Sequence, residues 1–159
     1  MSSKEAAALS TAQYWDERYA SKDSHEWLKS YLALTPFFEK HLFATRPFDS
    51  RILHLGSGDS EIPAELAQYG YRDQLCVDFS SVVVDQMSTL DAKRWGIHWI
   101  KADVRGMREI PDESIDVAFD KSTLDAMIHG SPWHPPEDVV DNTRKYMDEV
   151  IIVAQLGAR

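Results

Sequence analysis

The sequence predicts an α/β fold, a doubly wound, Rossmann-like and mostly parallel sheet with helices on both faces. Short runs of apolar and β-favouring residues occur at residues 51–55, 74–79, 97–101 and 114–119. Segments with apolar residues at helical spacing lie between them. This alternation of strand and helix is typical of parallel sheets with crossover connections.

The first fifty residues are predicted to be helical, because their aromatic and aliphatic residues recur at helical spacing, as in Trp27, Tyr31 and Leu34. We expect this N-terminal segment, residues 1–50, to contribute to a ligand site. Residues 51–159 should form the sheet-containing core. A chain of 159 residues fits one globular unit, since a typical domain has about 150 residues.

Helices are predicted after the first and second strands. The helix at residues 62–69 should end at Gly70, because glycine commonly terminates helices. The helix at residues 81–90 has Ser80 or Ser81 as its N-cap. With the four strands, these helices complete the predicted crossover pattern.

The composition narrows the possible partners. The formal net charge is −9, which argues against a broad phosphate-binding surface and therefore against nucleic acid. No apolar run approaches the roughly 20 residues needed to cross a bilayer. Cys76 is the single cysteine and the six histidines lack paired metal-ligand spacing, so we expect no metal site and no disulfide. A cytoplasmic or nuclear location fits best.

Two glycines follow the first strand, in the stretch "ILHLGSGDS". Gly56 and Gly58 would let a ligand approach the backbone closely, although a plain turn is about equally consistent with them. A dinucleotide fingerprint requires a third glycine where this chain has Glu61. An acidic loop without basic residues suits S-adenosylmethionine, which has no phosphate, better than it suits a pyrophosphate.

Polar residues follow the other three strands and should meet at the same edge of the sheet. Asp78 lies about 20 residues after the glycines, where it could accept hydrogen bonds from ribose hydroxyls or cap the next helix. Phe79 could flank an adenine or belong to the core. Asp103 follows the third strand, and Asp120 and Lys121 follow the fourth. Their joint occurrence favours an adenosine-containing ligand.

Several strings in the chain resemble a known family. The glycine loop, "VDFSSVVV", "ADVRGM" and "DKSTLDAM" are similar to motifs of class I S-adenosylmethionine-dependent methyltransferases. "YWDERYA" followed by "EWLKSY" resembles, more narrowly, the lysine methyltransferases of translation elongation factor one-alpha. The resemblance runs from about residue 13 to about residue 150 and implies S-adenosyl-L-methionine as cofactor and a protein lysine as methyl acceptor.

The resemblance also implies roles for individual residues. Asp78 would hold the ribose, while Phe79 would flank the adenine. For the displacement chemistry itself, Asp120 is the one candidate for orienting or deprotonating the incoming amine. With Gly58 from the glycine loop, the full set of expected cofactor contacts is Trp15, Tyr19, Trp27, Gly56, Gly58, Asp78, Phe79, Asp103, Val104 and Lys121.

The chain departs from the family pattern at several positions. His54 stands where many class I enzymes have an acidic residue for the amino group of the cofactor, although the elongation-factor group also lacks that acid. Ser57, Asp59 and Ser122 replace the Cys, Asn and Gly of relatives. We therefore expect a reduced cofactor affinity.

The family pattern continues beyond the helix predicted at residues 137–150, whereas this chain reaches "IIVAQLGAR", either a last helical turn or a short strand. This predicts a sheet that is incomplete at its C-terminal end and an exposed edge that favours self-association. Three functions follow in order of preference. They are a protein-lysine methyltransferase, a catalytically inactive cofactor-binding or interaction fragment, and a nicotinamide-dependent oxidoreductase.

Overall fold

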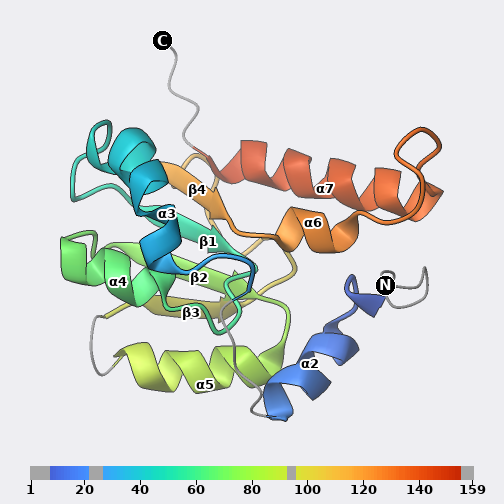
Figure 1. Ribbon diagram of the computed structural model, residues 1–159, viewed down its shortest axis with the longest axis horizontal. Coiled ribbons are helices and arrows are strands. Elements are labelled where there is room, and N and C mark those ends of the chain that lie inside the picture. The colour runs from blue at the N-terminus through green and yellow to red at the C-terminus, as the bar shows by residue number, and fades with distance from the viewer. Residues whose placement is uncertain (1–7, 22–26, 93–95, 155–159) are drawn as a thin grey trace.

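The computed structural model describes residues 8–21, 27–92 and 96–154. Within these residues, a four-stranded parallel sheet with the strand order β3-β2-β1-β4 forms the centre (Figure 1). The strands are β1 (Ile52–Leu55), β2 (Gln74–Asp78), β3 (His98–Lys101) and β4 (Val117–Asp120). The strand order reverses between β1 and β4, which is where doubly wound sheets bind ligands.

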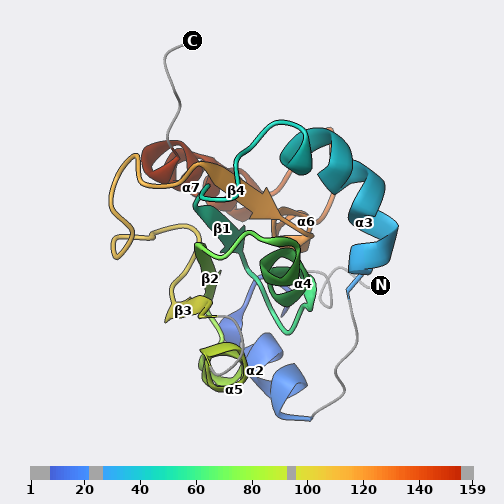
Figure 2. The same cartoon turned by 90° about the vertical axis from the view of Figure 1, so that its left-hand side faces the viewer.

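Helices cover both faces of the sheet (Figure 2). One face carries α3 (Tyr31–Phe38), its π-helical continuation η1 (Glu39–Phe43) and α4 (Ile62–Tyr69), and the other carries α6 (Thr123–Met127) and α7 (Glu137–Val153). The helix α5 (Ser81–Ala92) packs on β2 and β3, and α2 (Ala12–Ala20) packs on α5. The predicted doubly wound fold is confirmed.

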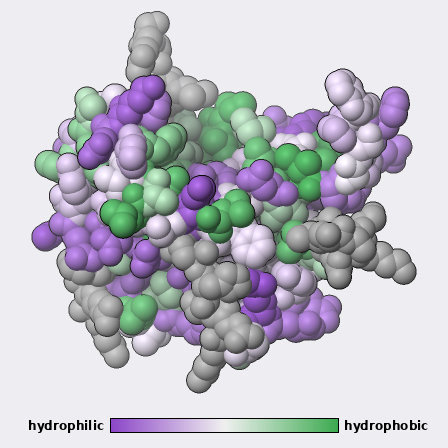
Figure 3. Space-filling model, in the orientation of Figure 1, coloured by the Kyte–Doolittle hydropathy of each residue, from purple (hydrophilic) through white to green (hydrophobic). Residues whose placement is uncertain are grey.

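The surface is mixed in character. Hydrophilic side chains surround small apolar patches on the face shown in Figure 3. Exposed apolar side chains in the described residues include Phe37 and Phe48. No helix in the described ranges is both long enough and apolar enough to span a membrane.

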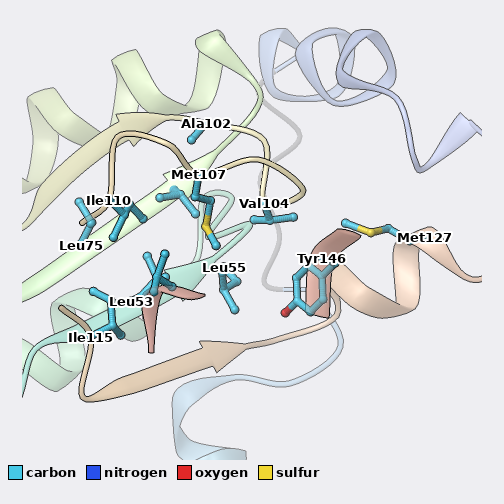
Figure 4. Close-up of a cluster of buried hydrophobic side chains, with 12 residues drawn as sticks. Leu53, Leu55, Leu75, Ala102, Val104, Met107, Ile110, Ile115, Met127 and Tyr146 are labelled. Carbon is cyan, nitrogen blue, oxygen red and sulfur yellow. The ribbon is translucent and has the colours of Figure 1, made fainter. Parts of the chain in front are cut away.

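The central strand β1 divides its side chains between two cores. Leu53 and Leu55 belong to the cluster beneath α6 and α7 (Figure 4), whereas Ile52 packs with α3 and α4 on the opposite face. All four residues of β1 are buried. A strand that is covered on both faces needs a nearly continuous apolar run, which explains why this strand can be recognised in the sequence.

The first fifty residues are less helical than predicted. Residues 27–30 are not helical, and a helix there is therefore a wrong prediction. Ser30 has extended backbone angles and acts as the N-cap of α3, with its hydroxyl accepting from the Ala33 N–H at 3.4 Å. An N-cap residue must leave the helical conformation, so α3 cannot continue backwards through this position. Residues 44–50 are also non-helical.

The end of the sheet differs slightly from prediction. The last strand begins at Val117, whereas Ile115 forms an isolated parallel bridge with Ala154. The helix α7 ends at Val153, so this tail gives a last helical turn followed by one bridging residue. Residues 155–159 lie outside the described residues, and self-association through the sheet edge stays a prediction.

The helix α6 starts from an unfavourable backbone conformation. Its N-cap residue, Ser122, has φ 82° and ψ 5°, which is the left-handed region. This conformation costs a residue other than glycine about 1–2 kcal/mol of conformational free energy. The Asp120 carboxylate accepts hydrogen bonds from the Thr123 and Leu124 N–H groups, at 3.0 and 3.1 Å, and holds the first turn in place.

Leu66→Ala should lower the free energy of unfolding by about 2–5 kcal/mol, because it leaves a cavity between α4 and β1. Leu66 is fully buried, with 0% of its surface exposed. Leu32→Ala is the matched control, since Leu32 is 80% exposed and its truncation should change stability by less than about 0.5 kcal/mol. Urea unfolding followed by circular dichroism measures both values. Equal losses would contradict the burial of Leu66.

Ser122→Gly should raise the free energy of unfolding by about 0.5 kcal/mol. Relief of the left-handed strain outweighs the entropy that glycine adds to the unfolded chain. Ser21→Gly is the control, because Ser21 has φ −71° and gains no such relief. Its expected effect has the opposite sign. Thermal and urea unfolding of both variants test this, and a less stable Ser122→Gly would refute the strain at α6.

Candidate functional site

A cavity lies at the carboxyl edge of the sheet, where the arrowheads point towards α2 and α6 in Figure 1. The residues that follow each of the four strands contribute to its wall, as the sequence predicts. The N-terminal segment adds a further wall. The residues predicted to bind a cofactor all line this cavity, namely Trp15, Tyr19, Trp27, Gly56, Gly58, Asp78, Phe79, Asp103, Val104 and Lys121.

The glycine loop packs tightly against its own neighbours. Gly56 and Gly58 have φ of 60° and 55°, a conformation that other residues rarely adopt. A Cβ atom at Gly56 would overlap the Thr123 side chain, and one at Gly58 would lie 2.7 Å from the Tyr19 hydroxyl. The positive φ angles and the internal packing together favour glycine at both positions, whether or not a ligand binds. Thr123 closes the loop by donating to the Leu55 carbonyl at 2.7 Å.

Asp78 connects the loops that follow β1 and β2. Its Oδ2 accepts from the Gly58 N–H at 3.0 Å and its Oδ1 accepts from the Ser80 N–H at 2.9 Å. Burial raises the pKa of this carboxyl to about 6, although both hydrogen bonds oppose the change. Each oxygen keeps a lone pair that can accept a ligand hydroxyl. The α5 N-cap is Ser80 rather than Asp78, because the Ser80 hydroxyl accepts from Val83 N at 3.4 Å.

The N-terminal helix α2 closes one side of the cavity. Its Asp16 accepts a hydrogen bond from the Ser80 hydroxyl at 2.6 Å, which ties α2 to the start of α5. Tyr19 lies against the glycine loop, and burial together with Asp78 and Asp59 raises the pKa of its hydroxyl. Following α2, the Trp27 carbonyl accepts from Lys121 Nζ at 2.7 Å. The N-terminal segment is thus fixed to two strand ends.

An aromatic and cationic cluster builds the inner surface of this N-terminal wall. The Trp15 ring stacks on Tyr19 with ring centroids 5.7 Å apart and meets Trp27 edge-on at the same distance. The Arg18 guanidinium lies 5.8 Å from the Trp15 centroid and 5.1 Å from that of Trp27. Such cation–π contacts hold flat apolar surfaces in place. The wall therefore combines stacking surfaces with a fixed positive charge.

His54 contributes a neutral ring to the cavity wall. Its Nε2 lies 2.6 Å from Gln74 Oε1, while Gln74 Nε2 donates to the Pro63 and Tyr71 carbonyls at 2.8 and 2.7 Å. Because both donors of this amide are used, its oxygen must accept and His54 Nε2 carries the proton. Burial lowers the pKa of His54 to about 4. The family position that often holds a carboxylate is therefore uncharged at neutral pH.

Asp120 is engaged in structural hydrogen bonds. Besides the two N–H groups at the start of α6, its Oδ2 accepts from the Tyr146 hydroxyl at 2.6 Å. Asp120 is not among the residues that line the cavity. Its catalytic role stays a prediction, and the observed contacts explain its presence as an anchor between β4, α6 and α7.

Sequence reasoning missed Arg105 and Thr123, which both line the cavity. Arg105 contacts the predicted Asp103, with Nη2 and Oδ2 2.6 Å apart. Arg105 lies in the string "ADVRGM" and Thr123 lies in "KSTLDAM". Their closeness in sequence to the predicted residues Asp103 and Lys121 could have identified them as candidates. In the described part of the chain, no group of histidine, cysteine and acidic residues could hold a metal ion.

The chain is similar in sequence to known methyltransferases. A family model described as "Methyltransferase domain" matches residues 53–147. The "EEF1A lysine methyltransferase 4" of Mus musculus is 34% identical over 152 residues, covering 92% of this chain and 58% of that protein. The human "eEF1A lysine and N-terminal methyltransferase" is 31% identical over 159 residues, covering 98% of this chain but 22% of that protein. The chain thus spans little more than half of the length of the first of these curated relatives and about a fifth of the length of the second.

Solved structures share the fold. The 1,6-didemethyltoxoflavin-N1-methyltransferase of Burkholderia thailandensis, solved with bound S-adenosylhomocysteine, has a TM-score of 0.62 at 19% identity. The match covers 98% of this chain and 60% of that one. The PH0226 protein of Pyrococcus horikoshii has a TM-score of 0.57 at 21% identity, with 77% and 50% covered. Since the family model matches more than half of its residues, this chain belongs to the methyltransferase domain family.

Proposed function

We propose that this chain binds S-adenosyl-L-methionine in the cavity and transfers its methyl group to a lysine side chain of a protein. Membership of the methyltransferase domain family supports the reaction type. The single observation that carries the binding step is the Asp78 carboxylate, which two backbone N–H groups fix in the wall of the cavity.

The residues present fit an adenosine-containing sulfonium cofactor. The remaining lone pairs of Asp78 suit two vicinal ribose hydroxyls. The adjoining Phe79 offers a flat apolar surface for a base, and the buried Val104 closes the cavity beyond it. The glycine loop presents Asp59 and no basic side chain, which suits a phosphate-free ligand.

The bound cofactor supplies an electrophilic methyl group on its sulfonium. The chain has to position this group and keep water away from it, so it needs no nucleophile of its own. We assign the exclusion of water to α2, because Tyr19 lies against Gly58 and the Trp15 ring adds a second aromatic face. The Lys121 contact to Trp27 holds this wall closed.

The proposed methyl acceptor is a lysine of an elongation-factor-like protein. One named relative is described as an EEF1A lysine methyltransferase and the other as an eEF1A lysine and N-terminal methyltransferase, and the matches to them cover nearly all of this chain. A lysine must lose its proton before it attacks, but Asp120 does not line the cavity and already accepts three structural hydrogen bonds. We therefore place proton release outside Asp120. A translation-factor substrate also implies a cytoplasmic location.

Isothermal titration calorimetry with S-adenosylmethionine, S-adenosylhomocysteine and NAD tests the binding step. The two sulfur-containing ligands should bind and NAD should not. Incubation with purified eEF1A and methyl-labelled cofactor, followed by mass spectrometry, tests the transfer to lysine. Binding without transfer would replace the proposed enzyme by the cofactor-binding fragment, and binding of NAD alone would refute both.

Asp78→Asn should lower the affinity for S-adenosylhomocysteine by about tenfold or more, because an amide group replaces one acceptor. In the wild-type protein, we expect the affinity to rise from pH 5 to pH 7 as Asp78 ionises around its pKa of about 6. The variant should lose this dependence. Asp85→Asn is the matched control, because Asp85 is exposed on α5. Calorimetry across this pH range measures both effects.

The same pKa change predicts how stability depends on pH. The pKa of Asp78 in the folded protein, about 6, lies above the ordinary aspartate value of 3.8, so the folded state retains this proton after the unfolded chain has lost it. The free energy of unfolding should therefore fall as the pH rises from about 4 to about 6. Urea unfolding of Asp78→Asn should show a smaller fall, and an unchanged profile would contradict the assignment.

A further inference from the structure

Asp103 is held by a side-on pair with Arg105. Its Oδ1 accepts from the Arg105 backbone N–H and from Nε, both at 2.9 Å, and its Oδ2 accepts from Nη2 at 2.6 Å. Such a two-point guanidinium contact fixes the orientation of the carboxylate as well as its charge. The side chains of Asp103 and Arg105 are 41% and 23% exposed, so the pair is partly shielded from solvent.

The Arg105 guanidinium is itself anchored on α7. Its Nη1 donates to Asn142 Oδ1 at 2.8 Å. A second tie lies two residues further along the loop, where the Met107 N–H donates to Glu149 Oε2 at 2.6 Å. The loop after β3 is therefore hydrogen-bonded to α7 at two points. The orientation of Asp103 consequently depends on α7, through Arg105.

These contacts leave Asp103 with limited capacity to accept further hydrogen bonds. A carboxylate has about four acceptor positions, two on each oxygen. Arg105 occupies both positions on Oδ1 and one on Oδ2. One acceptor position remains on Oδ2, and Asp103 is one of the residues that line the cavity. Although partial burial acts in the opposite direction, the Arg105 hydrogen bonds lower the pKa of Asp103 and keep it ionised.

We propose that Arg105 and Asn142 are positioning residues that hold Asp103 so that its one open acceptor position selects a ligand carrying an amino group on its base edge. Because Arg105 neutralises the charge of Asp103, the carboxylate can accept a hydrogen bond from a neutral N–H group and does not require a positively charged ligand group. A base with a carbonyl oxygen at the same place would face the carboxylate with two acceptors and no proton between them. This inference rests on the proposed function, because the ligand is the adenosine cofactor.

The test compares S-adenosylhomocysteine with its hypoxanthine analogue, in which oxygen replaces the 6-amino group. Calorimetry on the full chain should show at least about tenfold tighter binding of the amino form to the wild-type protein. Arg105→Lys keeps the charge but cannot form the two-point contact, so the preference should fall to about threefold or less. Asn142→Ala should reduce it partly, and Asn142→Asp should restore it because an acceptor for Arg105 returns.

Arg108→Ala is the matched control, since Arg108 is an exposed cation of the same loop and its loss should leave the preference unchanged. A readout without ligand is the pKa of Asp103, measured by carboxyl NMR titration. Arg105→Lys should raise it towards the ordinary aspartate range, and Arg108→Ala should not.

Wild-type binding with an unchanged preference and an unchanged Asp103 pKa in Arg105→Lys would overturn this inference alone. An absence of S-adenosylhomocysteine binding to the wild-type protein would overturn both the proposed function and the selection of the amino group.

Discussion

The buried carboxylate of Asp78 is the constraint on which the rest of the site depends. It ends β2 and accepts hydrogen bonds from the backbones of Gly58 and Ser80, so a single side chain fixes the path of two loops. The Ser80 hydroxyl then holds Asp16 and with it α2. Because a buried carboxylate is unfavourable without donors, these loops and the helix depend on one another.

The sheet makes this arrangement possible by dividing its central strand between two cores. Leu53 and Leu55 pack towards α6 and α7, while His54 on the opposite face meets the Phe119 ring with centroids 5.8 Å apart. The carboxyl end of β1 is thereby held from both sides, and Thr123 secures its last carbonyl. The glycine loop consequently starts from a rigid point, which a site built on close backbone approach requires.

The features that could be predicted from the sequence are those that depend on local pattern. Apolar runs located the strands, and parallel topology then placed Asp78 and Asp103 at one edge of the sheet. The remaining features depend on partners distant in sequence. The tautomer of His54 is fixed by Gln74, twenty residues away, and Arg105 is oriented by Asn142, 37 residues away. Spacing carries no information about such pairs, and likewise did not reveal that Ser30 interrupts the N-terminal helices.

The closure of the cavity by α2 has a consequence for the order of events during synthesis. The helix α2 leaves the ribosome before the sheet, but the partner of Asp16 follows 64 residues later and that of Trp27 follows 94 residues later. This wall can therefore be fixed in place only after β4 has emerged. Until then the Trp27 carbonyl lacks its Lys121 partner, and the nascent chain presents an open, unfinished cleft.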